Sequence, residues 1–225
     1  MRINKYLRDK GFASRREADE LIAAGKVFVN GVPAKEGMQI DEGDEVTVPS
    51  RREKTYTYLA YYKPTGLATQ APAGEESVIT NWQGKGIFPI GRLDKESEGL
   101  LILTNDRRLT ARVLGADAKV EKEYLVHVRE PLRQGIPAIM KKGMDTQAFG
   151  RLLPADARLV DKHAIFVTLQ EGKRHQLRVM FSELGYTISA LKRVRVGHVT
   201  LGNLRPGQTR ALNEQESKKF FEERN

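Results

Sequence analysis

Residues 91–104, GRLDKESEGLLILT, decide the fold of this chain. A short apolar run at 87–90 leads into Gly-Arg-Leu-Asp, and a second apolar run at 99–104 has the length and flanking residues of a buried strand. If both runs are buried, Asp94 lies where a core strand ends, with Arg92 two residues earlier on the same strand face. A rigid carboxylate at a strand end is well placed for chemistry. From local sequence alone, such an Asp is more often a turn-former or a helix cap.

The composition is that of a globular protein with an excess of basic side chains. The 225 residues include 38 Lys and Arg against 29 Asp and Glu, which gives a formal net charge of +9. The pI calculated from the sequence is about 9.7. This surplus favours a polyanionic partner, and nucleic acid is the first candidate. The chain has no cysteine, which excludes a disulfide framework and a thiolate metal site.

The sequence predicts no metal site and no membrane segment. The four histidines lack the spacing of metal ligands, and there is no run of about 18 apolar residues. The opening stretch, MRINKYLRDK, is amphipathic and charged and has no apolar centre. We therefore expect a cytoplasmic protein that does not bind a membrane.

Residues 1–48 are predicted to form a small domain of two helices and a small sheet. Ile3, Tyr6 and Leu7 lie on one helical face, and Ser14 begins a capping-box pattern that opens a second helix. An Asn-Gly dipeptide between two short apolar runs then predicts a hairpin, and a last short strand follows.

The sequence of this region, NKYLRDKGFASRREADELIAAGKVFVNG at 4–31, resembles that of the S4 RNA-binding domain. In that family the residues that face RNA lie on the two helices and the turn between them. The matching positions here are Arg2, Lys5, Ser14, Arg15, Arg16 and Lys26. Their cationic groups would neutralise phosphates, which gives salt-dependent affinity with little base information. The alternative is an ordinary solvated helix face.

A polar linker and a second domain are predicted to follow. Residues 49–54, PSRREK, are charged and aperiodic, and residues 55–225 form the remainder of the chain. The patterns in this remainder predict a strand at 55–62, a helix at 107–114, a strand at 121–128, a helix at 131–140, strands around 147–153 and 164–170, and a charged C-terminal helix at 213–225.

The stretch EGKRHQLRVMF at 171–181 predicts a further helix. Arg174 and Arg178 lie one turn apart on it, and His175 is three residues before Arg178. The apolar residues that form its core stripe are Leu177, Met180, Phe181 and Leu184.

Four motifs in this order, KPTG, GRLD, KEYL and EGKRHQLR, resemble those of the pseudouridine synthases. The resemblance is to the group that modifies single uridines in ribosomal RNA and carries an S4 domain. It implies an α+β protein whose catalytic domain has a mixed, mainly antiparallel sheet flanked by helices. It also implies no cofactor, a monomer, and ribosomal RNA or a ribosome assembly intermediate as the partner. The NKYL and EGKRHQLR wording favours the branch that acts on the large subunit.

The resemblance also implies roles for single residues. Asp94 matches the catalytic Asp of the family, and Arg178 matches the Arg that pairs with it. Tyr124 matches the Tyr that stacks on the target uracil, and Leu177 matches the apolar residue that lines the base pocket. Half-buried packing is the alternative for a strand Tyr. Further substrate contacts are predicted for Arg92, Lys63, Arg174 and His175.

Residues 185–212 carry several cations and no acidic residue, so we expect a basic flank beside the active cleft. Its predicted RNA contacts are Lys192, Arg193 and Arg195. Two positions depart from the family pattern. Tyr62 stands where Asn is usual, which alters a turn near the site, and Val179 stands where a second Arg is common, which removes an RNA contact.

The expected reaction needs few groups. Turning uridine into pseudouridine breaks the bond between C1′ and N1, turns the uracil and joins C1′ to C5, so a carboxylate near C1′ must attack it or remove a proton. Two other functions are compatible with the sequence. One is a non-catalytic RNA-binding or assembly factor on the same fold. The other is a hydrolase that uses Asp94 with Glu96 or Glu98 as a carboxylate pair.

Overall fold

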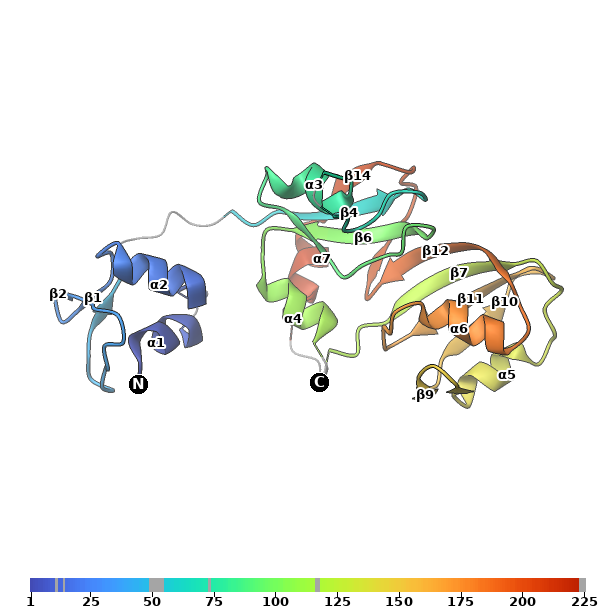
Figure 1. The fold of residues 1–225 in the computed structure, drawn as a ribbon, viewed down its shortest axis with the longest axis horizontal. Coiled ribbons are helices and arrows are strands. Elements are labelled where there is room, and N and C mark those ends of the chain that lie inside the picture. The colour runs from blue at the N-terminus through green and yellow to red at the C-terminus, as the bar shows by residue number, and fades with distance from the viewer. Residues whose placement is uncertain (11, 14, 49–54, 73, 116–117, 223–225) are drawn as a thin grey trace. The chain divides into compact units, whose positions relative to one another are not determined.

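The structure, a computed structural model, describes residues 1–10, 12–13, 15–48, 55–72, 74–115 and 118–222. It has two compact units, Met1–Thr55 and Tyr56–Asn225 (Figure 1). The predicted linker at 49–54 and Ser14, the predicted N-cap and RNA contact, lie outside the described residues, as does the side chain of Arg15.

The first unit packs two helices and a three-stranded sheet around one core. Its elements are α1 (Ile3–Asp9), α2 (Arg15–Ala23), β1 (Phe28–Val29), β2 (Val32–Pro33) and β3 (Val46–Thr47), in the strand order β2-β1-β3. Ile3 and Leu7, on the helical face predicted from the sequence, are fully buried in this core with Ile22. Asn30 and Gly31 have φ values of 50° and 78°, as a two-residue type I′ hairpin turn requires.

The second unit is built on a nine-stranded sheet with the order β10-β11-β7-β12-β6-β4-β14, to which β13 and β5 add. Its strands are β4 (Tyr58–Lys63), β5 (Phe88–Ile90), β6 (Glu98–Thr104), β7 (Lys122–Val128), β10 (Asp156–Leu159), β11 (Ala164–Leu169), β12 (Ile188–Val196), β13 (Val199–Thr200) and β14 (Thr209–Ala211). All pairs are antiparallel except β12 with β6. The predicted α+β class with a mixed, mainly antiparallel sheet is confirmed.

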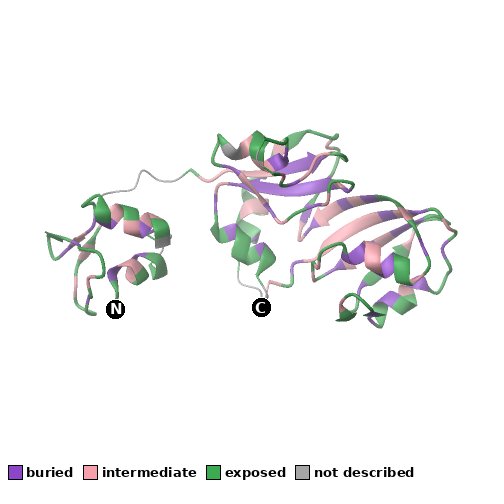
Figure 2. Ribbon diagram, in the orientation of Figure 1, coloured by how far each residue is buried: buried purple, intermediate pink, exposed green. Residues whose placement is uncertain are grey.

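The apolar run of the central stretch forms β6, which is buried on both faces (Figure 2). Leu100 and Ile102 pack with helix α4, whereas Leu101 and Leu103 pack with α3 on the opposite face. Burial on both faces explains why this strand is continuously apolar instead of alternating. The helices of the unit are α3 (Val78–Gln83), α4 (Arg108–Leu114), α5 (Ile136–Lys141), α6 (Gln176–Glu183) and α7 (Glu214–Lys219).

The edge of β6 that faces away from β4 is shared by two strands. β12 pairs with residues 98–99 in parallel, and β5 pairs with residues 102–104 in the antiparallel sense. The sheet therefore forks between these two positions. Residues 91–97, which carry the GRLD motif, connect the end of β5 to the start of β6. The start of β6 is the part that pairs with β12. This topology places Asp94 at the fork.

Three predicted elements differ in the structure. The helix predicted within 171–181 begins only at Gln176, so Arg174 and His175 precede α6 and Arg174 does not lie on the helix with Arg178. Strand β5 ends at Ile90, so Arg92 and Asp94 belong to a loop and do not share a strand face. The predicted strand at 147–153 is wrong, because the chain there forms a small hairpin of β8 (Asp145–Thr146) and β9 (Gly150–Arg151). Gly150, with φ of 64°, turns this hairpin. The partner of β11 is β10, which lies further along the chain.

Candidate active site

The loop that carries Asp94 is held by a buried threonine. Thr69 Oγ1 donates a hydrogen bond of 2.7 Å to the carbonyl of Leu93 and accepts one of 3.0 Å from the Leu93 amide. Both bonds are buried, and Thr69 is 3% exposed. Because both backbone groups of Leu93 are hydrogen-bonded, the backbone next to Asp94 is held in one orientation. No pattern in the sequence singles out Thr69, because it lies in a loop without periodicity.

Lys63 supports the same loop from below the surface. Its side chain is fully buried, and Nζ donates to the carbonyls of Pro64, Leu67 and Lys95 at 2.8, 2.6 and 3.4 Å. The predicted substrate contact for Lys63 is therefore wrong. Burial lowers the pKa of Lys63 to about 8, against the opposing effect of the Asp94 carboxylate, which favours the charged form.

We expect the free energy of unfolding of the second unit to increase as the pH rises from about 8 to 10.5. In this range folded Lys63 has lost its proton whereas the unfolded chain still binds it, so raising the pH favours the folded state. Urea unfolding followed by the fluorescence of Trp82, the one tryptophan in the sequence and a residue of this unit, measures the effect. Lys63→Met cannot titrate and serves as the control. Equal pH slopes in the variant and the wild type would contradict the prediction.

Arg193 of β12 fills the fork in the sheet. Its Nε donates at 2.8 Å to the carbonyl of Leu100, which lies between the β6 residues that pair with β12 and those that pair with β5. One amino group reaches the carbonyl of Arg92 at 3.4 Å, and the other is buried without a hydrogen-bond partner in the described part of the chain. Arg193 is only 5% exposed, so its predicted role as an RNA contact on a basic flank is wrong.

The basic neighbours of Arg193 on β12 form ion pairs with glutamates. Lys192 Nζ lies 3.2 Å from a carboxylate oxygen of Glu98, and Arg195 pairs with Glu121 and Glu123 at 3.1 and 3.3 Å. The acidic partners come from strands distant in the sequence. The prediction of a basic flank is therefore wrong for this strand. Arg210, which follows it in the sequence, is also paired, with Glu216 at 2.7 Å.

A cleft of about 860 Å³ opens beside the fork. Its lining includes Asp94, Tyr124, Leu177 and Arg178. These residues belong to the GRLD, KEYL and EGKRHQLR motifs, which were predicted to meet at one site. Arg92, Arg174 and His175, predicted as substrate contacts, also line it. Apart from the buried Arg193, the cationic side chains around the cleft are those of Arg92, Lys119, Lys122, Lys173, Arg174 and Arg178, whereas Asp94 and Glu171 carry its carboxylates. This balance suits a polyanionic ligand.

Tyr124 and Leu177 supply the apolar part of the cleft. Tyr124 lies on β7 and packs partly buried against two core clusters, and Leu177, in the first turn of α6, is 4% exposed. An aromatic ring and an aliphatic side chain in one cleft can hold a flat heterocycle between them.

The Asp94 carboxylate remains accessible, with 29% of its side chain exposed. Its Oδ1 lies 3.3 Å from His175 Nε2, and among the described residues no Lys or Arg nitrogen lies within 4 Å of this carboxylate. Arg178 donates instead to the hydroxyl of Ser97 at 3.4 Å. The pairing of Asp94 with Arg178 that the resemblance implied is not formed in this structure, although both side chains line the same cleft.

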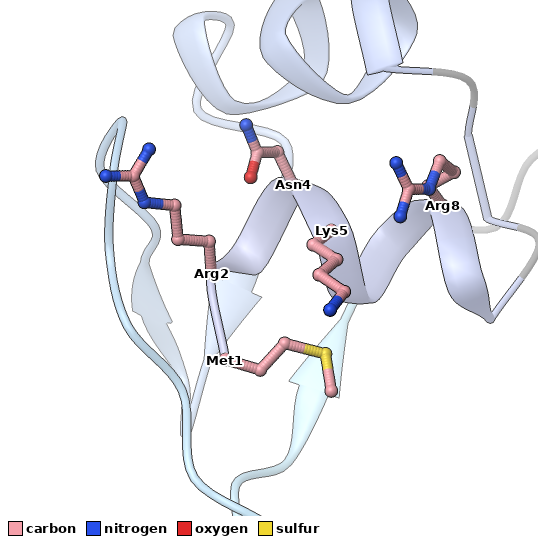
Figure 3. A pocket seen from close by; sticks show the side chains of 5 residues that line it. All are labelled: Met1, Arg2, Asn4, Lys5 and Arg8. Carbon is pink, nitrogen blue, oxygen red and sulfur yellow. The ribbon is translucent and has the colours of Figure 1, made fainter.

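The first unit presents its own basic surface. Arg2, Lys5 and Arg8 line a hollow of about 380 Å³ together with Met1 and Asn4 (Figure 3). The predicted cations Arg2, Lys5, Arg16 and Lys26 are exposed. Arg8 was not predicted as an RNA contact. Its guanidinium forms an ion pair of 2.8 Å with the carboxylate of the neighbouring Asp9.

The described residues contain neither a cluster of metal ligands nor a helix that could span a membrane. No group of three or more His, Cys, Asp or Glu side chains is arranged to hold a metal ion within this part of the chain. None of the helices in the described ranges combines the length and the hydropathy needed to cross a membrane.

Comparisons with known proteins match both units. A family model described as RNA pseudouridylate synthase matches residues 57–183, and the S4 domain model matches residues 1–46. The dual-specificity RNA pseudouridine synthase RluF of Escherichia coli (strain K12) is 37% identical, over 96% of this chain and 77% of that protein. An uncharacterized RNA pseudouridine synthase of Aquifex aeolicus (strain VF5) is 35% identical, over 98% and 94%.

A solved structure agrees with these matches. The crystal structure of a pseudouridylate synthase has a TM-score of 0.72 at 26% identity and covers 98% of this chain and 99% of its own. The synthase model spans more than half of the sequence, and the relatives align along nearly all of it. This protein therefore belongs to the RNA pseudouridine synthase family and carries an S4 domain N-terminal to its synthase domain.

Proposed function

We propose that this enzyme isomerises specific uridines of ribosomal RNA to pseudouridine, with Asp94 as the catalytic carboxylate. The observation that carries the proposal is the cleft that Asp94 lines together with Tyr124, Leu177 and Arg178. It combines one accessible carboxylate, two surfaces for a flat base and a surplus of cations for phosphates.

The chemistry follows from these groups. C1′ of a stacked nucleotide is inaccessible, so the uridine must leave the stack, at a cost of a few kcal/mol that phosphate and stacking contacts offset. Asp94 then attacks C1′ or removes a proton, and the bond from C1′ to N1 breaks. Tyr124 and Leu177 keep the detached uracil in place while it turns. C5 then bonds to C1′ while Asp94 is released from C1′ or returns the proton it removed. The hydrogen of C5 leaves as a proton to solvent, and N1 gains a proton. Arg178 supplies a guanidinium that stabilises the ionised carboxylate.

The choice of ribosomal RNA is supported by charge and by domain organisation. An S4 domain with exposed cations on its first helix accompanies a basic catalytic cleft, and together they suit a structured RNA. We propose that a monomer acts in the cytoplasm on large-subunit RNA in an assembly intermediate.

A hydrolase with paired carboxylates is less favoured by the geometry. Glu98 is bound to Lys192, and neither Glu96 nor Glu98 lines the cleft. The second carboxylate of the cleft, Glu171, accepts hydrogen bonds from the Gln176 amide and from the Leu153 backbone. These bonds hold it as a structural group.

The test is to map pseudouridines on both ribosomal RNAs from cells with and without this protein. We expect one position, or a few, on the large-subunit RNA to lose pseudouridine, and the purified enzyme to restore it with release of tritium from RNA labelled at uridine C5. Unchanged maps with intact RNA binding would favour the non-catalytic factor. Free uracil among the products would favour a hydrolase.

A further inference from the structure

His175 adopts a backbone conformation that its position does not require. It is the N-cap of α6, with φ of 58° and ψ of 22°, in the left-handed region. An N-cap residue normally has extended dihedrals and uses its side chain to cap the helix. The His175 side chain makes no capping bond. A left-handed residue other than glycine at a functional site needs another reason to be there.

The left-handed conformation coincides with a contact to the catalytic carboxylate. The His175 imidazole does not cap the helix that it precedes, and its Nε2 lies 3.3 Å from Asp94 Oδ1. This distance is slightly longer than that of a usual hydrogen bond and brings the two side chains into close polar contact.

The segment that holds His175 is rigid. Its neighbour Gln176 is 3% exposed. The Gln176 side chain accepts from the Lys173 amide at 3.0 Å and donates to Glu171 at 2.7 Å. These two bonds span the turn that precedes α6 and restrain the backbone that carries His175.

We propose that His175 is a positioning residue for Asp94, an inference that rests on the proposed function. Its Nε2 restrains the carboxylate so that one oxygen stays directed at the place where C1′ of the extruded uridine arrives. The imidazole takes no part in bond making or breaking. Arg178, one turn further along α6 and bound to Ser97, does not provide this restraint in the present structure.

Two substitutions, His175→Asn and His175→Gln, distinguish the effect of the left-handed backbone from the effect of the imidazole. Asn tolerates the left-handed region but places its amide near the position of Nδ1, too short to reach Asp94, whereas the amide of Gln falls near Nε2. We expect kcat of His175→Asn and His175→Ala to fall about 30-fold to 100-fold with little change in KM for RNA, because misplacing a reacting group by about 1 Å costs this much. His175→Gln should recover most of kcat.

His163→Ala is the matched control, because His163 is an exposed histidine of the same unit that does not line the cleft. It should leave kcat and KM for RNA close to those of the wild type. A fully active His175→Asn, a His175→Gln no better than His175→Ala, or an effect on KM alone would each overturn the inference. Asp94→Asn in the same assay separates the two claims: if it is inactive while the His175 variants match the wild type, only the role of His175 fails, and if it is active, the proposed mechanism fails.

Discussion

Asp94→Asn is expected to reduce tritium release from uridine-labelled RNA by at least about 10³-fold while RNA affinity stays nearly unchanged. The amide has almost the same shape as the carboxylate, so the loop bonds made by Thr69 and Lys63 remain. It is neutral and cannot attack C1′ or remove a proton. Affinity should persist because it depends on the cations of the cleft and of the first unit.

Glu96→Gln is the matched control for this variant. Glu96 lies two residues further along the same loop, is exposed and does not line the cleft. Removing its charge changes the local electrostatics without touching the proposed chemistry, so turnover should be close to that of the wild type. Full activity of Asp94→Asn would exclude a catalytic role for this carboxylate.

Gly99→Ala is expected to destabilise the second unit by about 4 kcal/mol, at the upper end of single-residue effects. Gly99 has φ of 109°, and a Cβ there would lie 2.3 Å from the carbonyl oxygen and 2.7 Å from the nitrogen of Arg193. These are backbone atoms of the paired strand β12, which cannot move aside as a side chain could. The variant must therefore open the sheet at the fork or leave it strained.

Urea unfolding followed by Trp82 fluorescence measures this loss, with Gly66→Ala as the control. Gly66 also has a positive φ, 83°, but no atom lies within 4 Å of its would-be Cβ. It should lose only about 1 kcal/mol from backbone strain. If both variants lost the same amount, close approach of β12 would not be the reason for glycine at position 99.

Several elements were predictable because their determinants are local. The apolar run of β6, the core stripe of α6 and the Asn-Gly turn of the first unit depend on periodicity and on turn chemistry within a few residues. Strand β12 was not predicted, because Lys192, Arg193 and Arg195 make it resemble a solvated basic segment. Their partners lie on other strands, about 70 to 100 residues away in the sequence.

The family, the fold class and the motif side chains that meet in the cleft follow from the amino-acid sequence, because ordered motifs carry that information in residue types and spacing. Which cations are available and which are internal supports depends instead on three-dimensional packing. Lys63 and Arg193 satisfy backbone carbonyls at the turn and at the fork, and His175 rather than Arg178 lies against Asp94. The physical reason is that burial and hydrogen-bond partners depend on strands that meet in space, and local sequence does not contain those distances.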